Sequence, residues 1–145
     1  MQNGKGFQLL INEIQKTIDA AKEFAALASY SNRCKEAVED LQKALQHLQS
    51  FAIKGEVELY MADATIFMEM CGIIAVAWQW LKQGVIAQKA LANEEKAAQT
   101  KLFYKSKLET MKFFYKYELP KTVALAQTLM HQDKVTIKMD DEILM

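Results

Sequence analysis

Glycine and proline are scarce in this chain, whose 145 residues include five glycines and one proline. Both residue types mark tight turns, so an all-β domain of this length would need many more of them. The shortage therefore predicts few secondary-structure elements, each of them long. The length suits a single domain with a core of its own.

A surplus of charge of one sign is also missing, since 18 basic and 18 acidic residues give a net charge of zero. Arg33 is the one arginine in the sequence. Proteins that bind nucleic acid usually carry a positive surplus and use arginine to bind phosphates. We therefore expect no nucleic-acid partner.

Cysteines are few, and Cys34 and Cys71 both lie at apolar helical positions. Two cysteines do not make a disulfide framework, and the N-terminus does not resemble a signal peptide. We expect two free thiols that pack as small apolar side chains, and a cytoplasmic location. The longest charge-free apolar stretch is residues 70–81. It is shorter than the roughly 18 residues that cross a membrane, so we expect no membrane span.

Apolar residues recur at spacings of three and four along most of the chain, the period of a helix with one buried face. The spacing predicts helices over about residues 7–28, 32–53, 56–92 and 94–130. The third is apolar nearly all round between residues 61 and 81, which is typical of a helix surrounded by others. We predict an all-α fold, an antiparallel (up-down) four-helix bundle with long third and fourth helices.

Polar residues and breakers mark the ends of these helices. Ser29 to Asn32 ends the first helix and offers the N-cap of the second, which Gly55 then ends. Glu94 and its acidic neighbour suit the first turn of the fourth helix. Pro120 removes a backbone hydrogen bond, so we expect a kink or break around it.

The pattern changes near the C-terminus, where Val135, Ile137 and Met139 alternate with polar residues. Alternation is typical of an extended segment rather than a helix. We therefore divide the chain into a helical bundle domain, residues 1–132, and an extended C-terminal tail, residues 133–145. A tail of this kind is ordered only where it packs on something.

Reactive side chains do not cluster in the sequence. His47 and His131 have no second ligand at the usual spacing for zinc, and neither belongs to the Glu-x-x-His pair of a diiron bundle. The glycines at positions 4 and 6 make too short a segment for a nucleotide loop. Asp63 and Glu69 interrupt the apolar third helix, and we expect each to face water or pair with a lysine rather than bind another surface. We predict no catalytic, cofactor-binding or metal-binding residue in this chain.

Aromatic side chains crowd the second half of the chain. Residues two positions apart on a helix point about 200° apart. Trp78 and Trp80 therefore lie on different faces of their helix, and so do Phe113 and Tyr115. One face would fill the core, and the other suits an interface, where Trp and Tyr are enriched. Core packing alone is the alternative. The candidate interface residues are Trp78, Trp80, Phe113, Tyr115 and Tyr117.

Three segments together resemble a known family. They are GKGFQLLINEIQKTI (residues 4–18), YMADATIFMEMCGIIAVAWQWL (60–81) and FYKSKLETMKFFYKYELPKTVAL (103–125). The chain resembles the C-terminal helical extension of the larger FAD-dependent acyl-CoA dehydrogenases. None of the three segments is a catalytic motif, so the resemblance rests on packing patterns.

The resemblance implies a longer, homo-oligomeric flavoenzyme of fatty acyl-CoA oxidation, with the FAD site and the acyl-CoA cleft in domains upstream of this one. This chain would then be an excised, non-catalytic domain that packs on the catalytic core or the subunit interface. The alternative is a stand-alone helical protein–protein interaction module. A bundle that lies on a membrane surface is less favoured, because we expect no helix to combine basic and aromatic faces.

Overall fold

A computed structural model describes residues 4–53, 55 and 57–131 of the chain. The secondary structure in this part is helical, which confirms the predicted all-α fold. The predicted tail, residues 133–145, lies outside the described residues. The helices are α1 (Lys5–Lys22), the short 3-10 helix η1 (Ala25–Leu27), α2 (Ala28–Ile53), α3 (Val57–Leu91), α4 (Ala98–Tyr117) and α5 (Lys121–Met130).

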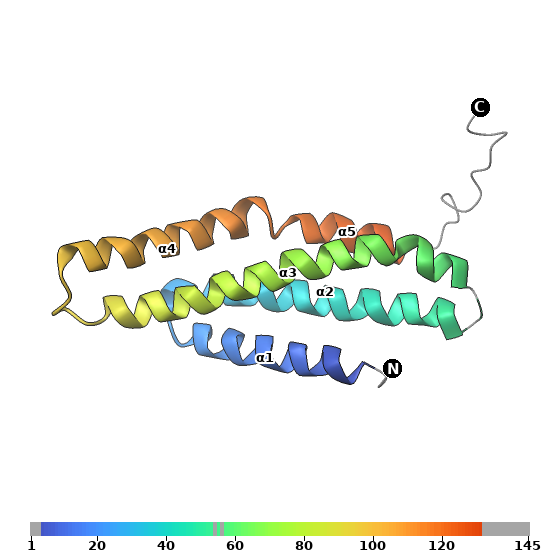
Figure 1. The fold of residues 1–145 in the computed structure, drawn as a ribbon, viewed down its shortest axis with the longest axis horizontal. Helices are drawn as coiled ribbons and strands as arrows, with labels where there is room; N and C mark the ends of the chain where they lie inside the picture. Colours follow the sequence, from blue (N-terminus) through green and yellow to red (C-terminus); the bar gives the residue numbers. More distant parts are fainter. Residues whose placement is uncertain (1–3, 54, 56, 132–145) are drawn as a thin grey trace, which may run out of the picture.

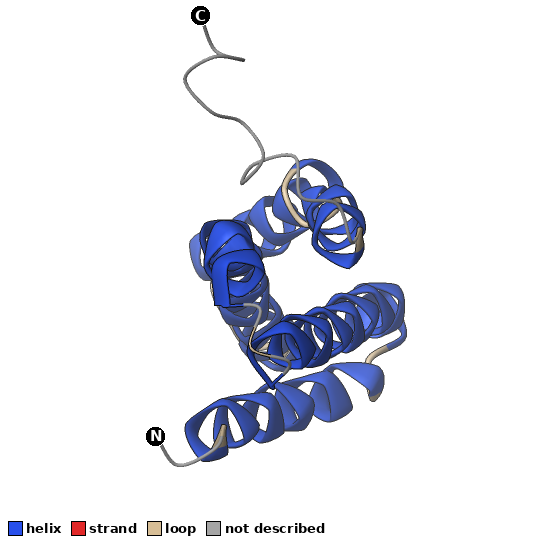
Figure 2. Ribbon diagram, turned by 90° about the vertical axis from the view of Figure 1, so that its right-hand side faces the viewer, coloured by secondary structure: helices blue, strands red, loops and turns tan. Residues whose placement is uncertain are grey.

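The α-helices lie along a common long axis, and α1, α2, α3 and α4 run in alternating directions (Figure 1). Helix α3 packs against α1, α2, α4 and α5, and α2 packs against α1, α3 and α5. Helix α1 and the α4–α5 pair lie on opposite sides of the molecule in both views (Figures 1 and 2). The apolar third helix is therefore the central element, as its composition predicts.

One apolar core joins all five α-helices and η1. Its buried members on α1 and α2 fall on the stripes that the helical spacing predicts. They are Ile11, Ile14, Ile18, Ala21, Cys34, Ala37, Val38, Leu41, Ala44 and Leu48. The other elements contribute Leu27, Met70, Ile74, Ala77, Leu81, Val85, Met111, Tyr115 and Leu129.

The end of α1 differs from the prediction, because the helix stops at Lys22 and the chain turns at Phe24 through an extended backbone conformation. Ser31, part of the segment expected to cap the second helix, lies inside α2 and is buried. Its Oγ donates a hydrogen bond to the backbone carbonyl of Ile18 at 3.2 Å. The serine thus joins α1 to α2, a use of the hydroxyl that sequence alone does not distinguish from a cap.

The connection between α3 and α4 is also longer than predicted. The expected start at Glu94 is wrong, because Asn93 Oδ1 accepts a hydrogen bond from the backbone N–H of Glu95 at 3.0 Å. Such a turn competes with helix formation, and α4 begins at Ala98. Between α2 and α3, Gly55 has a φ of 81°, the left-handed conformation that glycine favours after a helix.

The break at Pro120 is confirmed, since α4 ends at Tyr117 and α5 begins at Lys121. The backbone N–H of Leu119 donates to the carbonyl of Phe114 at 3.0 Å. Arg33 Nη2 of α2 donates to the carbonyl oxygen of Tyr115 at 2.8 Å. The arginine therefore satisfies a carbonyl in the last turn of α4, where helical donors run out.

Candidate docking surfaces

One side of α3 is exposed although it is largely apolar. Its large apolar side chains are between 44 and 66% exposed, and the residues between them are small or uncharged. All of them fall on one side of the helix at 100° per residue. We call this surface the α3 face, and it consists of Met61, Thr65, Met68, Gly72, Val76, Gln79, Gln83 and Ile86.

Among the described residues of α3, charged side chains lie at the edges of the α3 face and at its N-terminal end, where Glu58 is exposed. Glu69 and Lys82 are exposed at the edges, so Glu69 faces water as expected. Asp63 is half-buried on the same helix. An apolar surface of this kind with a polar rim is typical of an interaction site in a soluble protein. The α3 face is therefore the first candidate docking surface.

Helix α3 also meets a simple criterion for crossing a membrane. The stretch Asp63–Leu91 has 29 residues, a mean hydropathy of 1.5 in its most apolar window, and 22% of that window buried. The sequence prediction considered only the charge-free stretch of residues 70–81 and so did not identify this longer apolar segment. A core helix of a soluble protein passes the same test, so length and composition alone do not assign α3 to a membrane.

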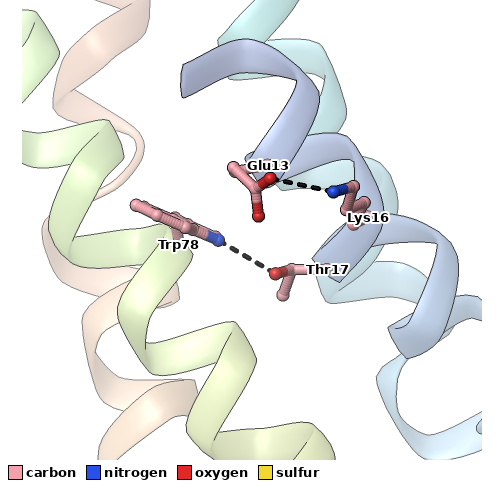
Figure 3. Close-up of polar contacts among 4 residues, drawn as sticks. All are labelled: Glu13, Lys16, Thr17 and Trp78. Carbon is pink, nitrogen blue, oxygen red and sulfur yellow. Dashed lines mark hydrogen bonds and ion pairs between the residues drawn. The ribbon is translucent and has the colours of Figure 1, made fainter. Parts of the chain in front are cut away.

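Trp78 lies beside the α3 face and connects α3 to α1 (Figure 3). Its Nε1–H donates a hydrogen bond to Thr17 Oγ1 at 2.9 Å. Lys82 Nζ lies 5.7 Å from the centre of the indole ring, within the range of a cation–π interaction. The side chain is half-buried, so Trp78 stabilises the α1–α3 contact and leaves only part of its ring for another surface.

A groove of about 270 Å³ runs between α1 and α3 at this point. Glu13 and Lys16 form an ion pair of 2.9 Å on its α1 side (Figure 3). The hydrogen bond and the charge of Lys16 lower the pKa of Glu13, and Lys82 adds to this effect across the groove. The groove reaches the α3 face at Ile86, and its lining residues are Glu13, Lys16, Thr17, Ala20, Trp78, Lys82, Val85 and Ile86.

Two of the other candidate interface residues have a different environment. Trp80 is half-buried against the core. Tyr115 is 0% exposed, its hydroxyl donates to the carbonyl of Ala77 at 2.8 Å, and its ring meets Tyr30 edge-on at 5.5 Å. Tyr115 therefore belongs to the core, which corrects its place in the predicted interface. The helical spacing places Tyr115 and Phe113 on opposite faces of the helix, but it does not predict which of the two side chains is buried.

The thiol nearest Tyr115 is buried as well. Burial raises the pKa of Cys34 to about 11, although its contact with Tyr115 works slightly against this. Burial also raises the pKa of the Tyr115 hydroxyl. Cys34 and Cys71 are both free thiols, in agreement with the prediction. Neither the thiol of Cys34 nor the phenol is ionised near neutral pH, so both act as packing groups.

Phe113 and Tyr117 are exposed on the outer side of α4, with ring centres 4.8 Å apart. Leu102 and Phe103 continue the same surface toward the start of the helix, and the four side chains are between 52 and 66% exposed. We call these four residues the α4 stripe. Lys116 Nζ lies 5.1 Å from the ring centre of Tyr117.

Lysines dominate the charge of α4, which has five of them and one glutamate. Exposed lysines and exposed aromatics thus lie side by side on α4, a combination that the sequence pattern did not single out. The α4 stripe is the second candidate docking surface.

A smaller cavity of about 180 Å³ lies between α2 and the α4–α5 break. Arg33, Glu36 and Asp40 line its α2 side. Because its guanidinium group donates a hydrogen bond to the carbonyl of Tyr115, Arg33 links α2 to the last turn of α4, next to the helix break. The sequence pattern did not predict this structural role for Arg33. The one feature that could have indicated it is that Arg33 is the single arginine of the chain.

Possible metal ligands do not cluster among the residues that the structure describes. Among them no group of three His, Cys, Asp or Glu side chains is placed to hold a metal ion. His131 is exposed and His47 is half-buried.

Comparison with known proteins gives one family. A model of the family described as acetyl-CoA dehydrogenase C-terminal like matches residues 10–140. No curated protein matches the chain. The matched range covers all of α2, α3, α4 and α5 and most of α1, and so includes both docking surfaces. The chain therefore belongs to the acetyl-CoA dehydrogenase C-terminal like family.

Proposed function

We propose that the chain is the non-catalytic C-terminal domain of an FAD-dependent acyl-CoA dehydrogenase that oxidises fatty acyl-CoA. The domain packs through the α3 face on the catalytic core or at the subunit interface. Its family membership supports the parent, and the exposed apolar α3 face supports the packing. The α3 face is the observation that carries the proposal.

The composition of the α3 face suits a permanent contact. The interfaces of obligate oligomers resemble a protein core cut in half, with few charges at their centre. Gly72 lies in the middle of the face, and an added Cβ there would meet no atom within 4 Å. A glycine in this place lets a neighbouring backbone approach α3 closely.

The remaining features of the parent belong to the same proposal. FAD and the acyl-CoA cleft lie in upstream domains, the parent is a homo-oligomer, and it is cytoplasmic. In the parent the domain is an up-down four-helix bundle, with α4 and α5 together as its fourth helix.

Removing the domain from the intact dehydrogenase tests the proposal. The truncated enzyme is compared with the full enzyme by sedimentation for its oligomeric state and by acyl-CoA turnover. We expect the truncated enzyme to dissociate, lose turnover or both, because a large apolar contact is lost. The packing idea fails if both measurements stay unchanged.

Point variants locate the contact within the intact enzyme. Met68→Gln together with Ile86→Gln places two polar groups on the α3 face, and we expect weaker association of the domain with the core. Leu9→Gln is the matched control, since Leu9 is similarly exposed but lies on α1. An equal effect of the control would move the contact away from α3. A natural reading frame without dehydrogenase domains would instead favour the stand-alone interaction module.

A further inference from the structure

The α4 stripe is a second apolar surface, separate from the α3 face, and its surroundings are basic. Phe113 and Tyr117 form its centre, and the described helices leave them more than half exposed. Lys112 and Lys116 are exposed beside them. The occupant that fits such a surface has apolar side chains flanked by acidic ones.

The C-terminal segment of the same chain, residues 132–145, has this chemistry. It carries four acidic residues and two lysines, while α4 carries five lysines and one glutamate. Helix α4 therefore has a net positive charge and residues 132–145 a net negative charge. Val135, Ile137 and Met139 alternate with polar residues, so an extended chain would present them on one side. Asp140 and its two acidic neighbours follow directly.

The reach of the segment is sufficient. Helix α5 continues α4 end to end (Figure 1), so Phe113 lies roughly 25 Å from Met130 at about 1.5 Å per residue. Met139 lies nine residues after Met130, and nine extended residues span roughly 30 Å. On the way back along α5, Met130 and Val123 are exposed apolar side chains. This register brings Met139 to Phe113 and the acidic run to Lys112.

The family match gives an independent reason to count the segment as part of the domain. It continues past the end of α5, to residue 140, and so includes the alternating apolar residues. We propose that residues 132–145 fold back in cis and cover the α4 stripe, with Val135, Ile137 and Met139 on the aromatic side chains and the acidic run beside the lysines.

Disulfide trapping in the full chain tests this placement. The variant Phe113→Cys/Met139→Cys is oxidised, and the product is identified by intact mass and peptide mapping. Its control is Met68→Cys/Met139→Cys, because Met68 is 66% exposed where Phe113 is 60% and lies on α3 instead of α4. Met139→Cys alone measures the background from Cys34 and Cys71.

We expect an intramolecular disulfide that forms at least about tenfold faster with Cys at 113 than with Cys at 68, because docking raises the effective concentration of the thiols. Lys112→Glu with Lys116→Glu should slow this reaction, because it reverses the charges that attract the acidic run. Lys22→Glu with Lys35→Glu, which reverses exposed charges on α1 and α2, should leave the rate unchanged.

Three results would overturn the proposal. Equal rates for the two cysteine pairs would mean that the segment has no preferred site. A disulfide-linked dimer as the main product would assign the stripe to a second copy of the chain. Sedimentation of the full chain with phosphatidylserine vesicles, lost when Phe113 and Tyr117 are replaced by Ser, would assign the stripe to an anionic lipid surface.

Discussion

Two glycines in α3 allow a sharp test of the packing. Gly72 and Gly84 both lie well inside the helix, where glycine lowers stability by roughly 0.5–1 kcal/mol relative to alanine. A Cβ at Gly72 would meet nothing within 4 Å. A Cβ at Gly84 would lie 2.7 Å from Met111 Sδ and 3.6 Å from Leu27 Cδ2. The two substitutions therefore share their local effect and differ only in packing.

The expected changes have opposite sign. Gly72→Ala should raise the free energy of unfolding by about 0.5–1 kcal/mol through backbone entropy. In Gly84→Ala the sulfur of Met111 has to retreat by roughly 0.7 Å, from 2.7 Å to the 3.4 Å of ordinary contact. Overpacking of this kind costs about 1–3 kcal/mol, which exceeds the gain in helix propensity. Gly84→Ala should therefore lower the free energy of unfolding.

Urea denaturation followed by far-UV circular dichroism measures both free energies of unfolding. An m-value equal to that of the unmodified chain shows that each variant still unfolds in a two-state manner. The double variant Gly84→Ala/Met111→Ala removes the obstructing sulfur. Its destabilisation should be smaller than the sum of the single variants, by about 1–3 kcal/mol. A close contact between position 84 and Met111 is ruled out if Gly84→Ala stabilises the chain as much as Gly72→Ala, or if the effects of the changes at Gly84 and Met111 are additive.

Other side chains give further predictions. Tyr115→Phe removes a buried hydrogen bond and should cost about 1 kcal/mol in urea denaturation, whereas the exposed Tyr117→Phe should change stability by less than about 0.5 kcal/mol. Thr17→Val removes the acceptor for Trp78 and should cost about 1 kcal/mol, with faster exchange of the indole N–H in NMR. The raised pKa of Cys34, about 11 against 9.0 for a free thiol, means that the folded state keeps its proton longer than the unfolded state. Stability should then be unaffected below about pH 9 and fall by up to about 1.4 kcal/mol per pH unit between pH 9 and 11. This fall should be weaker in Cys34→Ala, and a slope that is unchanged in that variant would contradict the assignment.

Much of the fold was predictable because helical periodicity is a local property. The stripes on α1 and α2, the glycine after α2 and the break at Pro120 each depend on residues within a turn or two of one another. The errors occurred where a polar side chain had two uses. Ser31 bonds to the backbone of α1 instead of capping α2, and Asn93 makes a turn that delays α4.

The candidate docking surfaces were only partly predictable. Sequence spacing separates the two sides of a helix but does not say which side faces a neighbour. Tyr115 and Phe113 were therefore equivalent in the sequence, and the structure buries the first and exposes the second. The α3 face was missed for the same reason, since a helix that is apolar all round gives no sign of which side stays uncovered.

The sequence by itself determined that the chain is helical, that its third helix is the apolar centre, and that it resembles its family. These follow from composition and from a period that each helix carries alone. Only the tertiary structure decided that the α3 face and the α4 stripe remain exposed. It also decided that the side chains of Arg33 and Tyr115 form hydrogen bonds to the backbone of other helices. Such facts depend on contacts between residues as many as 82 positions apart, which no local pattern encodes.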